Sequence, residues 1–183
     1  MFGKISIIGC GLIGSSILRA IQEKKIAAKI SVYDKSNKVL EYLKKNFTAD
    51  ICSNVSETTK DADLTIISSP LSSYKEILLS IKSSLKEGSI LTDTGSAKKE
   101  VNKIVNNLGF KNISWIASHP IAGTEYSGPA AGFSSLFQNR WCILSADNQV
   151  AKNKIESLEK FWFKLGSKVK IMSFEDHDYV LSL

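Results

Sequence analysis

The chain has 183 residues, of which 43% are hydrophobic, and this is enough to bury the core of one domain of ordinary size. The net charge of +6 comes from lysines spread over helix-like segments, which indicates a solvated surface, or at most a weak attraction for small anions, and argues against a nucleic-acid interface. No apolar run reaches the roughly 18 residues of a membrane span and the N-terminus lacks a signal-peptide pattern, so we expect a cytoplasmic protein that binds neither nucleic acid nor membrane.

Strands and helices are expected to alternate along the chain. Short apolar runs predict strands over residues 4–9, 29–34, 61–70, 89–94, 113–120, 140–146 and 167–173. Apolar residues at helical spacing predict helices over residues 12–25, 35–46 with Ser36 as N-cap, 71–88 with Gly88 just past the end, 97–109 and 151–166.

This alternation predicts an α/β fold of the Rossmann type, a doubly wound and mostly parallel sheet with helices on both faces. Right-handed crossovers favour the strand order 3-2-1-4-5-6, and we expect extra strands at one edge. The three cysteines, Cys10, Cys52 and Cys142, are scattered and show no CxxC spacing, so we expect free thiols rather than a disulfide framework, and no metal site.

A glycine motif follows the first strand. Gly9, Gly11 and Gly14 form GxGxxG, where the first glycine permits a tight turn, the second lets a pyrophosphate approach the backbone, and the third lets helix and strand pack closely. Asp34 ends the second strand, where a carboxylate can accept the ribose hydroxyls and repel a 2′-phosphate. The motif predicts an NAD site, although the neighbouring Lys35 leaves NADP open and a glycine-rich turn without a ligand is the alternative.

Polar residues also follow the later strands, at the edge of the sheet where ligands of this fold bind. Together with Leu12 and Ile13 of the glycine motif, Ser69 and Pro70 are expected to contact the cofactor. Ser96 either caps the next helix or positions a reacting group, and both roles are open. His119 is either a catalytic base or a core histidine that bonds a carbonyl group.

Four motifs in this order, "GCGLIGSS", "TDTGSAK", "HPIAGTEYSGP" and "DHDY", resemble the prephenate dehydrogenase family, which includes the arogenate and cyclohexadienyl dehydrogenases of tyrosine biosynthesis. The resemblance implies an NAD-dependent oxidative decarboxylation in which His119 accepts the hydroxyl proton of the substrate. It also implies that Ser96 hydrogen-bonds this histidine and the substrate. Gly123 and Thr124 would face the substrate, which would be prephenate or arogenate, and Asp178 would lie near it in a charge network.

The resemblance further implies a domain organisation. Residues 1–173 would form the NAD-binding domain, and residues 174–183 would begin a helix that leads to a C-terminal helical dimerisation domain absent from this chain. The full-length form would be a homodimer, and a non-catalytic NAD-binding fragment is the alternative for this chain. His177, within the last motif, is expected to be a surface histidine near a helix N-terminus.

Overall fold

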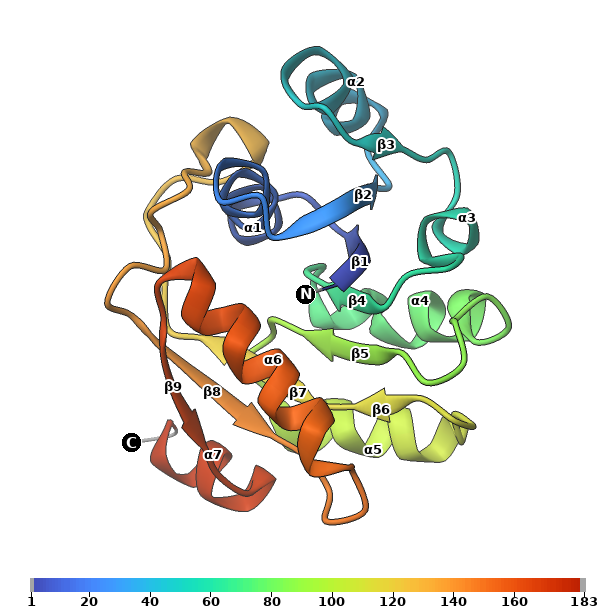
Figure 1. The fold of residues 1–183 in the computed structure, drawn as a ribbon, viewed down its shortest axis with the longest axis vertical. Coiled ribbons are helices and arrows are strands. Elements are labelled where there is room, and N and C mark those ends of the chain that lie inside the picture. The colour runs from blue at the N-terminus through green and yellow to red at the C-terminus, as the bar shows by residue number, and fades with distance from the viewer. Residues whose placement is uncertain (1, 182–183) are drawn as a thin grey trace.

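The computed structural model describes residues 2–181 and contains one six-stranded and one three-stranded sheet (Figure 1). The strands are β1 (Phe2–Ile8), β2 (Ala27–Tyr33), β3 (Asp50–Ile51), β4 (Leu64–Ile67), β5 (Ile90–Asp93), β6 (Ser114–Trp115), β7 (Ala117–Pro120), β8 (Trp141–Ser145) and β9 (Lys168–Ile171). The α-helices are α1 (Leu12–Glu23), α2 (Asn37–Asn46), α3 (Val55–Thr59), α4 (Tyr74–Ile81), α5 (Lys98–Leu108), α6 (Lys152–Leu165) and α7 (Phe174–Val180), and two short 3-10 helices are η1 (Leu71–Ser73) and η2 (Pro129–Ala131).

The larger sheet is parallel throughout and has the order β3-β2-β1-β4-β5-β6, which confirms the predicted Rossmann-type order. Its third strand, β3, has only two residues and was not among the predicted strands, because two residues cannot show a hydrophobic period. The predicted strand over residues 61–70 is therefore β4, the fourth strand of the order.

The expected extra strands are present as a sheet of their own, in the order β7-β8-β9. β7 runs antiparallel to β8, and β8 runs parallel to β9. The apolar run over residues 113–120, predicted as one strand, is divided at Ile116 between the two sheets. His119 therefore belongs to β7 of the smaller sheet, next to β5 of the larger one.

The helix predicted over residues 71–88 ends early, and this prediction was wrong in its extent. The structure has η1 followed by α4, which ends at Ile81. Ser84 donates both its backbone N–H and its hydroxyl to the Ile81 carbonyl, and such local serine bonds compete with helix continuation. Gly88 lies further on, in a turn with φ of 75°, and donates its N–H to the Asn112 carbonyl.

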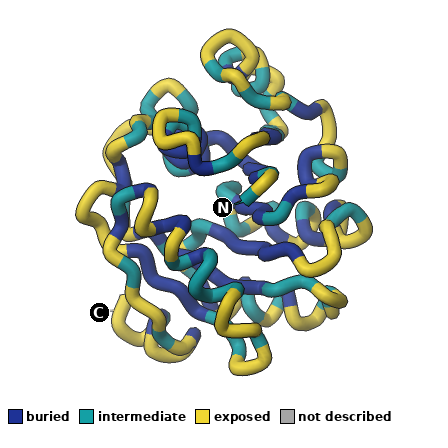
Figure 2. The backbone as a smooth tube through the Cα atoms, in the orientation of Figure 1, coloured by how far each residue is buried: buried dark blue, intermediate teal, exposed yellow. Residues whose placement is uncertain are grey.

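Both faces of the larger sheet carry a core, as Figure 2 shows by the buried strands at the centre of the fold. Along β1, Ile5 and Ile7 join the core under α1 and α6, whereas Ile8 joins the core under α4 and α5. Phe174 of α7 is buried in this second core. α7 thus packs against α5 and beside β8, which places the last motif of the sequence next to His119 of β7. Within residues 2–181, no helix is long and apolar enough to cross a membrane.

Candidate functional site

A cleft of about 680 Å³ lies at the carboxyl ends of β1, β2, β4 and β5. This volume falls within the range of about 300–1,000 Å³ that is usual for small-molecule and cofactor sites. Ser96 and His119 line the cleft. So do all the predicted cofactor residues except Gly14, namely Gly9, Gly11, Leu12, Ile13, Asp34, Ser69 and Pro70. The structure therefore brings the predicted residues of three strand ends to one cavity.

Each glycine of the motif has the environment that its predicted role requires. Gly9 has φ of 92°, and a side chain there would also collide with Ser69. A Cβ at Gly14 would collide with the carbonyl oxygen of Gly9, so this glycine is needed for the close packing of α1 on β1. A Cβ at Gly11 would meet open space, because this position faces the cleft.

The start of α1 is suited to an anion. Gly11 is its N-cap, and in the described chain no side chain caps this helix end and no acidic residue lies in its first turn. The first backbone N–H groups of the helix are consequently open to a ligand at the positive end of the helix dipole. Together with the glycine at the cleft wall, this fits the pyrophosphate of a dinucleotide.

Asp34 is held in a fixed orientation at the cleft. One carboxylate oxygen accepts the Cys10 N–H at 2.8 Å and the other accepts the Ser36 N–H at 2.9 Å. Each oxygen keeps a free lone-pair site, so the carboxylate can still accept ribose hydroxyls. Lys35 lines the same cleft. Burial, together with the charge of Asp34, raises the pKa of the Cys10 thiol, which agrees with a packing role for Cys10 rather than a nucleophilic one.

The two histidines of the chain lie in contact. The Nδ1 atom of His119 is 2.9 Å from Nε2 of His177, and Nδ1 of His177 is 2.7 Å from a carboxylate oxygen of Asp178. Because a carboxylate accepts hydrogen bonds, the neutral form of His177 that satisfies both contacts has its proton on Nδ1 and accepts on Nε2. His119 then donates its own Nδ1–H, which leaves Nε2 as the lone pair available to a ligand in the cleft that His119 lines.

The prediction of His177 as a surface histidine was wrong, because its side chain is fully buried. The helical pattern of residues 174–183 predicted that His177 lies near the start of a helix. It could not predict which elements pack over the side chain. One signal was available: a chain with two histidines carries both of them within motifs of the same family.

Asp178, and not Ser96, accepts the free backbone N–H groups at the start of α5. Its two oxygens accept the backbone N–H groups of Lys98 at 3.1 Å and of Lys99 at 3.0 Å, at the start of α5. The capping role considered for Ser96 is therefore wrong, since Ala97 is the N-cap and no side chain of the described residues caps α5 from that position. Burial works to raise the pKa of Asp178, but the bonds from His177 and from these two amides outweigh it and lower the pKa.

Ser96 itself is exposed and lines the same wall as His119. Gly123 and Thr124 lie in an exposed loop beyond the cleft, where the Thr124 hydroxyl accepts the Tyr126 N–H at 3.2 Å. Substrate contacts by Gly123, Thr124 and Asp178 stay predictions. The cleft wall formed by η1 and α4 was not predicted; it includes Leu71, Ser73, Glu76 and Ile77.

A buried ion pair joins the end of β5 to the start of α5, beside the strand that carries His119. The ammonium group of Lys98 is 2.7 Å from both carboxylate oxygens of Asp93, and both side chains are at most 1% exposed. Asp93 also accepts the N–H of Ser118, the residue before His119. The Ser118 hydroxyl bonds Thr92 and accepts the indole N–H of Trp162. This buried network fixes β7 to β5, and with it the backbone that carries His119.

Burial, and next the nearby charge of Lys98, lower the pKa of His119 from its ordinary 6.5 to about 4. The imidazole is consequently neutral at neutral pH and has a lone pair ready to take a proton. Since the unfolded chain keeps the ordinary pKa, it binds more protons than the folded chain between these two values. The contribution of His119 therefore lowers the free energy of unfolding as the pH falls from 6.5 toward 4.

In the ligand-free chain, the imidazole of His119 should titrate with a pKa of about 4. The proton NMR signals of the two imidazole rings, followed across the acid range, measure this value directly. A His177→Gln variant assigns the signals, because it leaves a single histidine. A midpoint near 6.5 for His119 would contradict the burial and charge effects described above.

Comparison with known proteins agrees with the fold and with a nucleotide-binding domain. Residues 17–171 match the family described as "Prephenate dehydrogenase, nucleotide-binding domain". The chain is 35% identical to a cyclohexadienyl dehydrogenase of Zymomonas mobilis over all of this chain and 62% of that protein. It is 32% identical to a prephenate dehydrogenase of Lactococcus lactis over 97% of this chain and 48% of that protein.

A solved structure of prephenate dehydrogenase from A. aeolicus, in complex with hydroxyphenyl propionate and NAD+, has the same fold. It superposes with a TM-score of 0.88 and 26% identity, over 98% of this chain and 63% of that chain. This chain thus spans less than two thirds of the length of each of these three relatives.

Proposed function

Because this chain belongs to the prephenate dehydrogenase family, as its nucleotide-binding domain, we propose that it binds NAD and supplies the base for converting prephenate to 4-hydroxyphenylpyruvate in tyrosine biosynthesis. The observation that carries the proposal is the chain of contacts His119–His177–Asp178 at the wall of the nucleotide cleft. A cofactor cleft alone suits many reactions, whereas a neutral, oriented imidazole beside it suits the removal of a proton from an alcohol.

The reaction proposed is an oxidative decarboxylation. When bound, NAD supplies the nicotinamide that accepts the hydride from C4 of the substrate. His119 takes the proton of the C4 hydroxyl on Nε2, and the electron pair of that O–H bond forms the C4 carbonyl group. The bond between C1 and the carboxylate then breaks and carbon dioxide leaves. Its electron pair moves through the ring to the C4 carbonyl oxygen, which becomes the phenolate of an aromatic ring and regains the proton held on Nε2 of His119. No second acid is needed for the departing group.

The residues behind His119 support this step. The Nδ1–H of His119 stays bonded to His177, so the ring keeps its orientation while Nε2 is protonated. The ionised carboxylate of Asp178 stabilises the resulting positive charge through His177. Ser96, on the same wall, is proposed to hydrogen-bond the substrate hydroxyl and His119.

A second candidate is the oxidation of arogenate, alone or beside prephenate. It is supported by the relative named cyclohexadienyl dehydrogenase, which matches all of this chain. We also propose the domain organisation that the resemblance implies, with residues 1–173 as the NAD-binding domain and residues 174–183 as the start of a helix leading to a C-terminal dimerisation domain. Of that segment, residues 182 and 183 lie outside the described residues.

The test is direct. The chain is mixed with NAD and either prephenate or arogenate, and NADH absorbance is followed, while calorimetry measures NAD binding separately. NADH formed with prephenate supports the first proposal, and NADH formed with arogenate only would replace it by the second. Binding of NAD without NADH formation from either substrate would leave a non-catalytic NAD-binding module.

Replacing Asp34 with Asn should weaken NAD binding about tenfold, because a charged acceptor for the ribose hydroxyls is lost. Affinity for NADP should fall less, since the carboxylate no longer repels a 2′-phosphate, so the preference for NAD over NADP should shrink. Calorimetric titration with both cofactors measures the two constants. Asp50→Asn, at an exposed carboxylate away from the cleft, is the control. An unchanged ratio would remove Asp34 from the ribose site.

A further inference from the structure

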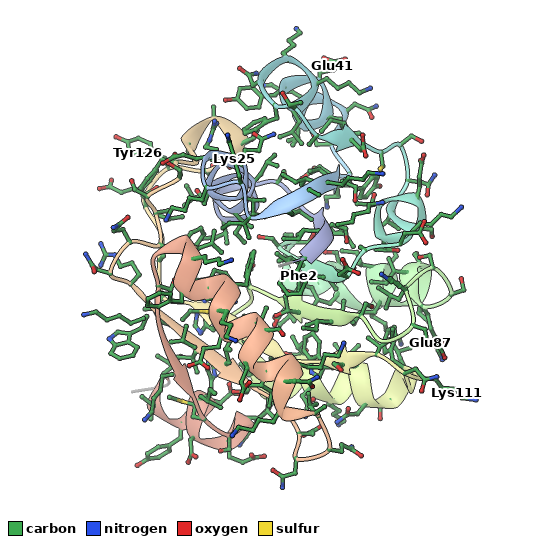
Figure 3. The ribbon with its side chains drawn as sticks, viewed as in Figure 1. Phe2, Lys25, Glu41, Glu87, Lys111 and Tyr126 are labelled. Carbon is green, nitrogen blue, oxygen red and sulfur yellow. The ribbon has the colours of Figure 1, made fainter. Side chains whose placement is uncertain are left out.

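The segment between β7 and β8 begins directly after His119 and Pro120. At its first end, the Ile121 N–H donates to the Trp141 carbonyl at 2.7 Å, which ties it to β8. Residues 123–127 are exposed, and Tyr126, at 75% exposure, points away from the molecule (Figure 3). We call residues 121–128 the bordering loop, because Ala122 lines the cleft beside His119. A loop with so few contacts of its own takes its position from its two ends.

The second end of the bordering loop is fixed on α1. Figure 1 shows the short turn η2 beside this helix. The Phe133 N–H donates to the Ser16 hydroxyl at 3.1 Å, and Ser16 is fully buried. Gly132 packs so closely that a Cβ would collide with the Ser15 hydroxyl, so the backbone of the segment lies directly on the helix.

Arg19, one turn further along α1, holds the same segment. Its guanidinium donates to the Pro129 carbonyl and to the Tyr42 hydroxyl, each at 3.1 Å. It also stacks on the ring of Phe47, 4.6 Å from the ring centre. Its Nε atom is buried and, among the described residues, has no hydrogen-bond partner. Both bonds leave from the same nitrogen, Nη2, while the guanidinium lies over Phe47, so the position of this one nitrogen between two acceptors and the stacked group together hold the segment.

We infer that Ser16 and Arg19 are positioning residues for the bordering loop, and through it for access of the substrate to His119. α1 starts at the glycine motif of the cofactor cleft, and its side chains Ser16 and Arg19 hold the segment that follows the bordering loop. One helix therefore sets the position of the loop relative to the cofactor site. Neither residue lines the cleft. The part of this inference that concerns substrate rests on the proposed function, while the anchoring of the loop does not.

The first test is amide hydrogen exchange on the chain without substrate. Ser16→Ala and Arg19→Met should each speed exchange about fivefold at the hydrogen-bonded amides of the two loop ends, Ile121 and Phe133, since each variant removes a bond that holds the loop. Ser157→Ala is the control, because the Ser157 hydroxyl donates only within α6, to the Asn153 carbonyl, away from the loop. Exchange in Ser16→Ala no faster than in Ser157→Ala would overturn the anchoring.

The second test is steady-state kinetics with the dienol substrate. Ser16→Ala and Arg19→Met should raise KM for this substrate, while kcat and the Kd for NAD change less than about twofold, and Arg19→Lys should restore part of the loss. A parallel loss of NAD affinity, or an unchanged KM, would overturn the positioning role. If the unaltered chain shows no turnover, the proposed function fails, and hydrogen exchange still decides the anchoring.

Discussion

Replacing His119 with Asn should lower kcat by about 10²–10⁴-fold, the usual contribution of a positioned general base. The amide of Asn can still donate to His177, but it offers no basic nitrogen to the substrate hydroxyl. The Kd for NAD should stay within about twofold, because the residues proposed to hold the cofactor, the glycine motif and Asp34, do not depend on the imidazole. Initial rates of NADH formation and calorimetric NAD titration measure the two quantities.

His177→Gln is the matched comparison for this variant. It keeps a side chain that can accept from His119 but breaks the continuous path to Asp178, so kcat should fall by less than in His119→Asn. Turnover retained in His119→Asn would end the assignment of His119 as the base. Equal losses in both variants would show that orientation of the ring, rather than its proton affinity, limits the reaction.

Replacing Asp93 with Asn should lower the free energy of unfolding by about 3–5 kcal/mol, the usual cost of removing one partner of a buried ion pair. Lys98, whose pKa burial already lowers, would be left without its counter-ion in a site with at most 1% exposure, where either keeping or losing its proton costs free energy. The Ser118 N–H would also lose a charged acceptor, which loosens the backbone beside His119. Urea-induced unfolding measures the change, provided that the slope with urea stays the same.

Two further variants test the cause of this loss. Asp93→Asn combined with Lys98→Met removes both charges and should recover much of the stability, because no unpaired buried charge remains. Lys86→Met, which breaks the surface ion pair with Asp63, should change stability little. If the double variant is less stable than Asp93→Asn alone, the hydrogen-bond network rather than the charge balance carries the stability of this region.

The local parts of the fold were predictable because they depend on the side chains and backbone conformations of residues that are neighbours in the sequence. The period of apolar residues distinguishes strands from helices within about ten residues. The glycine motif is predicted from conformational demands at single positions, and the structure shows such demands at Gly9 and Gly14, where a side chain would collide with neighbouring atoms. The apolar pattern predicted a helix beyond Ile81, but α4 ends there, where Ser84 bonds the Ile81 carbonyl in competition with the helix.

The sequence by itself determined the α/β class, the strand order, the nucleotide cleft and the place of His119 at a strand end. Only the tertiary structure decided which groups stand behind that histidine. His177 lies 58 residues away in the chain, and it reaches His119 because Phe174 buries α7 against α5. Asp178 replaces Ser96 at the start of α5 for the same reason. Such contacts depend on how distant elements pack, and no local period or turn preference encodes them.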